Sequence, residues 1–379
     1  LYLDDTRWVD EELEALTHLP NLRVLSLQET NISPETLQYM RQMDSLEELN
    51  IIRTDLDKDN AAALKDIQNL KQIHWSDESI RNIGMGRMKS LKNVWNQRLS
   101  GENIQQSDVA YLQYLPNLRS IHLSSWSITD ADIRCLGNID TLREVILAET
   151  QITDTGVSHL ADLVNIRELN LQGTKVTAKG LSYLENMDKL RKLFVFDTKI
   201  TDKGLAHLEK LGNLRKLFLH RTGIKGKGLH HLENLADLRC LSLSDNDIAN
   251  AALSSVAKIT ELRELNLHNT NISDRGLRHL KDLKKLEELY LFDNKITNNG
   301  LSHLQNLTAL QDLDLSGTKI TDRGLKYLKE LNNLRDISLS DTAVTDAGLK
   351  YLKDFKNLWE IDLENTKVTD QGVANLKKA

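Results

Sequence analysis

Histidine, cysteine and the carboxylates are the residue types in this chain that could catalyse a reaction or bind a metal ion. Of its 11 histidines, five recur at the same place in a repeating pattern: His159, His207, His231, His279 and His303. Each precedes a leucine that we expect in the core, so these imidazoles should lie on the outer surface of short helices. Neighbouring helices pack about 8–10 Å apart, too far for several histidines to bind one zinc ion at about 2 Å. We therefore expect surface residues rather than a metal site.

The two cysteines and a glycine-rich segment do not form a recognisable catalytic site either. Cys135 and Cys240 lie too many repeats apart for an internal disulfide, and the sequence assigns a base to neither thiol. Residues 223–228 read GIKGKG, which lacks the GK[ST] ending of a phosphate-binding loop. The acidic residues lack the compact loop spacing of a calcium site. The sequence thus predicts a chain that is not an enzyme and that holds neither a metal ion nor a cofactor.

Net charge and apolar runs restrict the expected partners. The formal net charge is −6, whereas a phosphate-binding surface normally shows a basic excess; we expect neither nucleic acid nor a small-molecule substrate. No apolar run approaches the roughly 18 residues of a transmembrane helix. The lack of predicted disulfides favours a cytoplasmic location. A periplasmic or cell-surface location stays open, because residues 1–3 resemble the middle of a repeat and suggest a truncated N-terminus.

A 24-residue repeat positions these side chains along the whole chain. Its first residues align as Leu22, Leu46, Leu70, Leu91, Leu118, Leu142, Ile166, Leu190, Leu214, Leu238, Leu262, Leu286, Leu310, Leu334 and Leu358. The residue number increases by 24 at each step except on either side of Leu91, where it increases by 21 and then by 27. Positions of each repeat are numbered from this first residue below.

Each repeat combines a short strand with a short helix. In residues 310–333, the pattern L-x-x-L-x-L has the period of two that is typical of a strand. Thr318 then turns the chain, and its side chain can bond the neighbouring backbone. Thr321 and Asp322 are a helix-start signal, and the leucines that follow at three-residue spacing give the helix one apolar side. Gly324 occupies a position where glycine recurs; since glycine costs helix stability, we expect close backbone approach between neighbouring coils there.

The pattern L-x-x-L-x-L-x-x-T-x-I-T-D-x-G-L-x-x-L resembles the leucine-rich-repeat family over the whole chain. It is most similar to bacterial members with 24-residue TDxGL repeats and to the ribonuclease-inhibitor-like branch. The resemblance implies an α/β solenoid, a curved right-handed arc with a parallel β-sheet on its concave face and short helices on its convex face. We expect a single domain over residues 1–379, with a partial repeat at 1–21, regular repeats at 22–69, two irregular repeats at 70–117 and regular repeats at 118–379.

The irregular repeats at residues 70–117 lose the TDxGL signal and contain large side chains. These are Trp75, Met85, Met88 and Trp95. One interpretation is an eroded repeat whose core is filled by large, flexible side chains. The other is a distorted coil that projects residues 97–106 as a binding loop.

Recognition should use positions three, five, seven and eight of each repeat, whose side chains alternate with the core leucines. The same position in successive repeats forms a column, one strand spacing apart. The candidate partner-binding residues are Trp95, His122, Ile146, Phe194, Phe196, Phe218, His220, Arg221, His268, Tyr290, Phe292, Asp314, Asp336 and Asp362. Four of the five phenylalanines belong to this set, and aromatic anchors favour an interface. The alternative is cross-strand stacking that stabilises the sheet.

Charge is distributed unevenly over the repeats. The C-terminal end of the concave face is acidic, with Asp312, Asp314, Asp336, Asp341, Glu360, Asp362 and Glu364. Like charges on adjacent strands repel, so a protein partner with a basic segment would relieve the repulsion. Position two carries seven successive arginines, from Arg119 to Arg263. We expect them to pair with acids of their own and adjacent coils; the alternative is an edge that binds an anionic ligand or nucleic acid.

These patterns together predict a protein–protein recognition module or scaffold that binds a macromolecular partner on its concave face. Members of the family it resembles are typically recognition modules, sometimes fused to kinase, ligase or secretion domains. One alternative is therefore the substrate-recognition arm of a larger ligase or kinase whose catalytic part is absent. A second alternative is a structural spacer.

Overall fold

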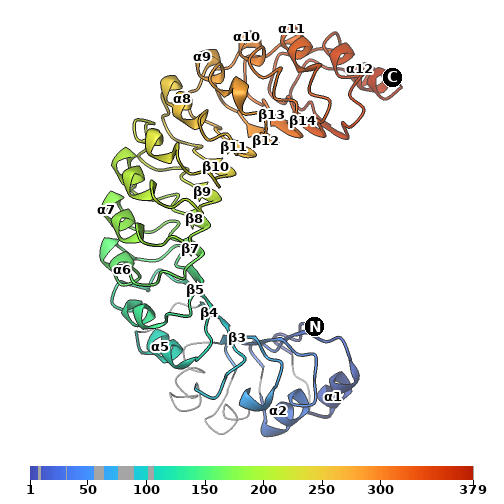
Figure 1. Cartoon of the computed structure of the whole chain (residues 1–379). Coiled ribbons are helices and arrows are strands. Elements are labelled where there is room, and N and C mark those ends of the chain that lie inside the picture. Colours follow the sequence, from blue (N-terminus) through green and yellow to red (C-terminus); the bar gives the residue numbers. More distant parts are fainter. Residues whose placement is uncertain (7–9, 31, 55–63, 76–88, 101–105, 379) are drawn as a thin grey trace. The chain divides into compact units, whose positions relative to one another are not determined.

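The computed structural model of the chain describes residues 1–6, 10–30, 32–54, 64–75, 89–100 and 106–378 (Figure 1). Its coils group into two compact units, Leu1–Val176 and Thr177–Ala379. Within each unit the strands follow one another in sequence order and pair in parallel. Short helices lie on the opposite side of the coils from the strands (Figure 1). The predicted α/β solenoid is confirmed, whereas the single domain over residues 1–379 stays a prediction.

The first unit runs from Leu1 to Val176. Its strands are β1 (Val24–Ser26), β2 (Glu48–Ile51), β3 (Gln72–Trp75), β4 (Asn96–Ser100), β5 (Ser120–Ser124), β6 (Glu144–Ile146) and β7 (Glu168–Asn170). Its described α-helices are α1 (Asp10–Glu14), α2 (Pro34–Met40), α5 (Gln106–Tyr111) and α6 (Asp154–Ser158). Its 3₁₀ turns are η1 (Ala15–His18), η2 (Leu64–Asp66), η3 (Leu112–Tyr114) and η4 (Arg134–Asn138).

The second unit repeats the same arrangement with greater regularity. Its strands are β8 (Lys192–Phe194), β9 (Lys216–Phe218), β10 (Cys240–Ser242), β11 (Glu264–Asn266), β12 (Glu288–Tyr290), β13 (Asp312–Asp314), β14 (Asp336–Ser338) and β15 (Glu360–Asp362). Its α-helices are α7 (Ala178–Leu181), α8 (Leu253–Val256), α9 (Asp274–Leu277), α10 (Asn298–Leu301), α11 (Asp322–Leu325) and α12 (Asp370–Leu376). Its 3₁₀ turns are η5 (Ser182–Leu184), η6 (Asp202–Leu208), η7 (Leu229–Leu232), η8 (Asn250–Ala252), η9 (Leu280–Asp282), η10 (Lys326–Leu328) and η11 (Leu349–Tyr351).

The leucine pattern determines which side chains enter the core. In the repeat 310–333, the fully buried side chains are Leu310, Leu313, Leu315, Ile320, Leu325, Leu328 and Leu331. Adjacent strands pair position by position, so that Leu289 lies opposite Leu313 and Tyr290 opposite Asp314. Burying one such apolar side chain contributes about 1.5–3 kcal/mol. An isolated coil has no neighbours to bury these leucines, so the stability of each coil depends on the coils beside it.

The segments behind the strands contain α-helix, 3₁₀ turn or both. In the same repeat α11 ends at Leu325, and η10 continues to Leu328. Side chains three residues apart eclipse one another in a 3₁₀ helix, which is why leucines at three-residue spacing reach one core. The predicted short helix is confirmed, with a tighter turn than an α-helix has.

Threonine or asparagine at position nine closes the turn behind the strand, as predicted. Thr318 is 5% exposed, and its Oγ1 donates to the Leu315 carbonyl at 2.6 Å. The Asn294 side-chain amide donates to the Leu267 carbonyl at 2.7 Å and to the Leu291 carbonyl at 3.0 Å. These bonds satisfy buried backbone carbonyls, and the Leu267 carbonyl also accepts a hydrogen bond from the Thr270 hydroxyl.

In several repeats an aspartate at position 13 links its coil to the next one. The Asp322 carboxylate accepts the Thr345 backbone N–H at 2.8 Å and the Thr345 hydroxyl at 2.8 Å. Gly348 of the same next coil leaves room for that carboxylate, because a Cβ there would lie 2.5 Å from Asp322 Oδ1. The same two bonds join Asp274 to Thr297. The recurring glycine does mark a close approach between neighbouring coils, but at Gly348 the expectation that backbone meets backbone is wrong, because the close neighbour is the Asp322 carboxylate.

The register around Leu91 differs from the one predicted from the sequence. The Trp95 N–H donates to the Lys71 carbonyl at 3.0 Å, and the Arg119 N–H donates to the Trp95 carbonyl at 2.7 Å. The steps from Lys71 to Trp95 and from Trp95 to Arg119 therefore both have the regular repeat length. Val94, only 1% exposed, is the first residue of its repeat. The predicted short and long steps on either side of Leu91 are wrong, because leucine also occupies position 22 of the repeat and Leu91 lies there.

The corrected register moves three side chains of this coil. Trp95 occupies position two, immediately before the strand, and position five belongs to Arg98. Gln97 occupies the inward position four, where it is fully buried and lies opposite Ile73 and Ile121 of the adjacent strands. The prediction that Trp95 belongs to the position-five column is therefore wrong.

The predicted binding loop at residues 97–106 is only partly described. Residues 97–100 form most of β4, and Gln106 begins α5. Residues 101–105 lie outside the described part of the chain, as do Met85 and Met88. The loop and the eroded-repeat interpretation both stay predictions.

Candidate interaction surface

Two pairs of stacked rings lie on the strand face of the second unit, defined here as positions three, five, seven and eight of its repeats. Phe194 and Phe218 pair in register on β8 and β9, with ring centroids 4.7 Å apart and planes within 4°. Phe196 and His220 stack at 3.8 Å and 22°. The cross-strand stacking weighed as the alternative is thus present. All four rings are half-buried rather than enclosed in the core, so each still meets solvent.

His220 is the polar member of this aromatic block. Burial lowers its pKa. Nearby carboxylates act to raise the pKa, but they do not outweigh burial and the neighbouring cations. The Ser242 hydroxyl lies 3.4 Å from its Nδ1. The imidazole that stacks on Phe196 is therefore neutral at physiological pH.

A second aromatic block lies on β12 and the residues that follow it. His268 and Phe292 stack with centroids 4.1 Å apart and planes within 10°. The Tyr290 hydroxyl donates to Glu288 Oε2 at 2.9 Å and to Asp312 Oδ2 at 3.2 Å. Burial, followed by the hydrogen bond to Glu288 and the nearby carboxylates, raises the pKa of Tyr290 above its ordinary value. The hydroxyl therefore stays protonated and acts as a donor.

An ion-pair network centred on Asp245 lies between the two aromatic blocks. Asp245 Oδ2 lies 3.4 Å from Arg221 Nε and 3.2 Å from His268 Nε2, and Asn269 donates to Oδ1 at 2.9 Å. Burial acts to raise the pKa of Asp245, but the hydrogen bond from Asn269 and the interactions with His268 and Arg221 outweigh it, so the pKa is lowered. Arg221 has a φ of 49°, in the left-handed region that few non-glycine residues adopt.

Position three of the second unit forms a column of side chains whose charge changes sign along the sheet. In strand order the column reads Lys192, Lys216, Cys240, Glu264, Glu288, Asp312, Asp336 and Glu360. The first aromatic block is therefore on the strands that carry lysines, and Tyr290 is on a strand that carries an acid. The acidic end was predicted from the sequence; the lysine end was missed, although the same column would have revealed it.

The acidic end of this column is electrostatically unfavourable, as predicted. Burial raises the pKa of Asp336, and the Glu360 and Asp314 carboxylates raise it further. Burial also raises the pKa of Asp312; the hydrogen bond from Tyr290 opposes this effect, and the Asp336 carboxylate adds to it. A cation close to these two carboxylates would offset the repulsion from the neighbouring carboxylates.

Serine hydroxyls donate hydrogen bonds to Asp314 and Asp362, the two other aspartates among the predicted partner-binding residues. The Ser316 hydroxyl donates to Asp314 Oδ1 at 2.5 Å, and the Ser338 hydroxyl donates to Asp362 Oδ2 at 2.9 Å. The hydrogen bond from the Glu364 backbone N–H lowers the pKa of Asp362, and hydrogen bonds from the Ser338 and Ser340 hydroxyls also lower it. Asp362 is therefore an anion at neutral pH.

The other predicted residues belong to the first unit. His122 and Ile146 lie opposite each other on β5 and β6. Burial lowers the pKa of His122, and the charges of Arg98 and His74 lower it further. Arg98 was missed from the sequence because of the wrong register at Leu91; the correct alignment would have placed it beside His122.

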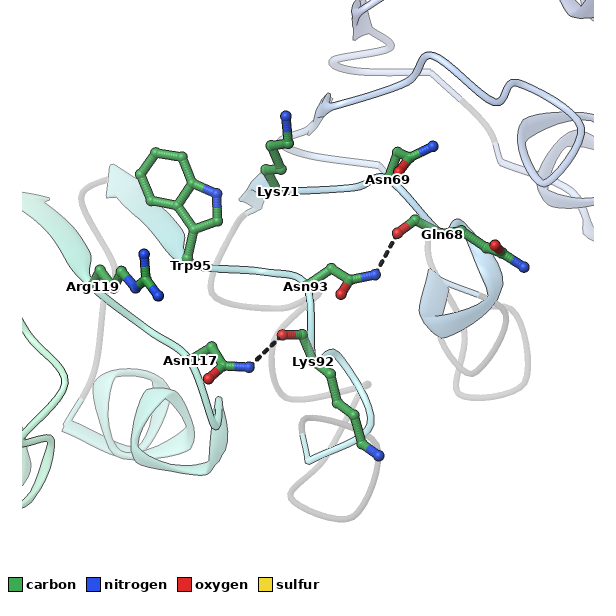
Figure 2. A pocket seen from close by; sticks show the side chains of 8 residues that line it. All are labelled: Gln68, Asn69, Lys71, Lys92, Asn93, Trp95, Asn117 and Arg119. Carbon is green, nitrogen blue, oxygen red and sulfur yellow. Dashed lines mark hydrogen bonds between the residues drawn. The ribbon is translucent and has the colours of Figure 1, made fainter.

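Trp95 lies in a hollow of the first unit with a volume of about 540 Å³ (Figure 2). The hollow is lined by Gln68, Asn69, Lys71, Lys92, Asn93, Trp95, Asn117 and Arg119. Two of its asparagines have a structural role, since Asn93 donates to the Gln68 carbonyl, and Asn117 donates to the Lys92 carbonyl at 2.7 Å. The Trp95 side chain is 39% exposed.

Known protein families and solved structures agree with this architecture. Residues 260–320 match a family model described as leucine-rich repeat, and a second model with the same description matches residues 140–161, 163–184, 234–257 and 330–353. The fold is that of the leucine-rich-repeat proteins. A search of curated proteins finds no match. Membership of the ribonuclease-inhibitor-like branch of leucine-rich-repeat proteins stays a prediction.

Three solved leucine-rich-repeat structures illustrate the likeness. An internalin (inlF) from Listeria monocytogenes is 22% identical with a TM-score of 0.58, over 98% of this chain and 87% of that one. A leucine-rich-repeat protein of Leptospira interrogans is 18% identical with a TM-score of 0.64, over 96% and 89%. TLR13, in a complex with ssRNA13, is 22% identical with a TM-score of 0.65, over 94% of this chain and 55% of that one. At these identities the likeness concerns the leucine-rich-repeat fold alone.

Two further expectations concern membranes and disulfides. No helix among the described residues is long and apolar enough to cross a membrane. Cys135 and Cys240 are both free thiols.

Proposed function

We propose that the strand face of the second unit binds a protein segment that carries basic residues. The observation that carries this proposal is the column at position three, in which Asp312 and Asp336 have raised pKa values because burial and neighbouring carboxylates disfavour their charged forms. Cationic side chains of a partner would relieve that repulsion and gain charge-assisted hydrogen bonds. The acidic end thus favours lysine and arginine in the bound segment.

The stacked rings supply the apolar part of the same proposed surface. Phe194 and Phe218 hold each other at a fixed orientation and remain half-buried. Rings that are already ordered lose little conformational entropy on binding, which makes them suitable anchors. We expect them to contact an apolar or aromatic side chain of the segment.

The proposed role is binding rather than catalysis. A nucleophilic cysteine needs a lowered pKa, whereas burial raises the pKa of Cys135 to about 11 and raises that of Cys240 even more. No group of histidine, cysteine or acidic side chains among the described residues could hold a metal ion. A scaffold role, a bacterial source and a cytoplasmic location stay predictions alongside this one.

Selection from a library of random twelve-residue peptides tests the proposal directly. The peptides that bind the wild-type chain should combine basic residues with an apolar or aromatic residue. They should bind Phe194→Ser/Phe218→Ser and Asp312→Asn/Asp336→Asn variants at least about tenfold more weakly, with circular dichroism confirming that both variants fold.

A matched control separates this site from general charge effects. Asp282→Asn/Glu330→Gln removes two exposed acids outside the strand face, with the same change in net charge, and should leave peptide binding unchanged. Selected peptides that bind all variants equally, or that lack basic residues, would contradict the proposal. A spacer function would then fit the chain better.

A further inference from the structure

We infer that the hollow around Trp95 in the first unit binds a planar ring that carries an anionic group, the chemistry of a nucleotide base with its phosphate. The site is separate from the strand face of the second unit. The inference does not depend on the function proposed for that face.

The residues around the hollow suit an anionic ligand. The described residues that line it comprise three cations, four side-chain amides and one tryptophan, and no carboxylate is among them. The chain as a whole has a net charge of −6, so this local excess of positive charge runs against the average. Local charge distribution, rather than net charge, decides where an anion binds.

The indole of Trp95 lies among these cations. Trp95 follows Lys71 and precedes Arg119 in the position-two column, and the three are joined through their backbone hydrogen bonds. Figure 2 shows the indole standing between the side chains of Lys71 and Arg119, while the Lys92 side chain extends away from it. A ring stacked on Trp95 would therefore have a cation on either side to receive its anionic group.

The fold does not require tryptophan at position two. The equivalent residues of neighbouring coils are the polar side chains Glu47, Lys71, Arg119 and Arg143, so a charged side chain fits there. An indole that is 39% exposed leaves apolar surface in water. Aromatic side chains next to Lys and Arg are the combination that stacks bases and neutralises phosphates.

Size and existing bonds are compatible with this ligand. A volume of about 540 Å³ lies within the roughly 300–1,000 Å³ of small-molecule sites. Lys71 pairs with Glu47 at 2.6 Å, an exposed ion pair that a bound anion can share at little cost. Arg119 is exposed to solvent. The ligand would thus use the indole and two cations, while Asn93 and Asn117 keep the coils together.

The same chemistry could come from a free nucleotide or from one residue of a single-stranded nucleic acid. Arg143 and Arg167 continue the position-two column beyond Arg119 in the first unit. A single-stranded nucleic acid would add contacts to these arginines, whereas a free nucleotide would not reach them. The two sources therefore predict different dependence on Arg143 and Arg167.

Calorimetric titration of the full chain with adenosine 5′-monophosphate, adenosine, inorganic phosphate and a five-residue oligoadenylate tests the inference. The monophosphate should bind more tightly than adenosine or phosphate alone, and more weakly as salt increases. If the oligoadenylate binds much more tightly than the monophosphate, and the Arg143→Gln/Arg167→Gln variant loses this difference, the natural ligand is a single-stranded nucleic acid. An oligomer that binds like the monophosphate identifies a free nucleotide.

Substitutions in the hollow provide the decisive comparison. Trp95→Lys restores the residue type of the column, should fold, and should abolish the preference for the monophosphate over inorganic phosphate. Lys71→Gln/Arg119→Gln should weaken monophosphate binding roughly tenfold or more and flatten its salt dependence. Trp126→Ala, which removes another exposed tryptophan of the first unit, should have no effect. Failure of the monophosphate to bind at millimolar concentration, equal binding of adenosine, or unchanged binding by Trp95→Lys would overturn the inference.

Discussion

Gly348 lies against the Asp322 carboxylate of the preceding coil, so that a Cβ at Gly348 would stand 2.5 Å from Asp322 Oδ1. Two hydrogen bonds from Thr345 hold that carboxylate in place. Gly348→Ala should therefore destabilise the chain by about 1–3 kcal/mol, the usual cost of overpacking a fitted site. Urea unfolding followed by circular dichroism measures the change. The matched control is Gly212→Ala, where a Cβ would meet nothing within 4 Å; equal stability of the two variants would refute the close-packing explanation.

Asp322 can be exchanged in two ways that separate charge from hydrogen bonding. Asp322→Ala leaves the Thr345 N–H and hydroxyl without their acceptors, and we expect a loss of about 1–3 kcal/mol. Asp322→Asn should be tolerated, because Asn298 occupies the same position in an adjacent repeat. Its Oδ1 accepts the Thr321 N–H at 2.9 Å, and its Nδ2 donates to the Thr321 hydroxyl at 2.9 Å. Thermal unfolding of both variants is sufficient. A large loss in Asp322→Asn would mean that the negative charge itself is needed.

Gln97 is a buried polar side chain in a column of isoleucines. Its Oε1 has no hydrogen-bond partner within the part of the chain that the structure describes, and it lies opposite Ile73 and Ile121. An unsatisfied buried polar group costs about 1–3 kcal/mol, so Gln97→Ile should stabilise the chain by an amount of that order. Ile121→Gln should have the opposite effect. A destabilised Gln97→Ile variant in urea unfolding would show that Gln97 has a specific partner.

Asp336 should make stability depend on pH. Its pKa in the folded chain lies above the unfolded value because of burial and neighbouring carboxylates. The contribution of this group is therefore favourable below the unfolded pKa and is lost as the pH rises through the folded pKa. Asp336→Asn cannot ionise, so it should raise the melting temperature at pH 7 and leave it nearly unchanged at pH 3. Asp282→Asn, with the same change in net charge, should lack this effect; an equal gain would attribute the result to net charge.

Phe194 and Phe218 require a test that distinguishes sheet stability from recognition. A double-mutant cycle with Phe194→Leu and Phe218→Leu should give a coupling free energy of about 0.5–1.5 kcal/mol in unfolding. If the rings also anchor a partner, peptide binding should fall further than the loss of stability explains, since leucine keeps apolar area but loses the flat ring. Coupling near zero would mean that the stacked geometry contributes nothing to the sheet.

The repeat sequence was sufficient to predict most of the fold. Period-two leucines predicted the strands, and the leucines at three-residue spacing predicted the short helices that the chain forms as α-helix followed by 3₁₀ turn. The role of Thr318 in the turn was predicted correctly, and Gly324 does lie where two coils pack closely, although against the Asn298 side chain rather than against backbone. Each of these features depends on contacts that every regular coil repeats.

The register around Leu91 was mispredicted because leucine occupies several positions of one repeat. Matching leucines alone allowed the first position to shift from Val94 to Leu91. Asparagine at the last position of the repeat was the better marker: Asn69, Asn93 and Asn117 each donate to a carbonyl of the preceding coil, and Asn93 immediately precedes Val94. That shift hid both Arg98 and the cationic surroundings of Trp95. Ring stacking and the Asp245 network depend on side-chain angles that sequence spacing does not determine.

The bonds from Asp274 to Thr297 and from Asp322 to Thr345 have a consequence for how such a chain can change in length. Each bond pair runs from one coil to the next in the same direction, and both partners recur at fixed positions of the repeat. Removing or duplicating a whole coil between two such bond pairs would rejoin an aspartate to a threonine of the same kind, without a new kind of junction. The span of the binding surface can therefore lengthen or shorten in evolution by genetic slippage, while the chemistry between coils stays the same.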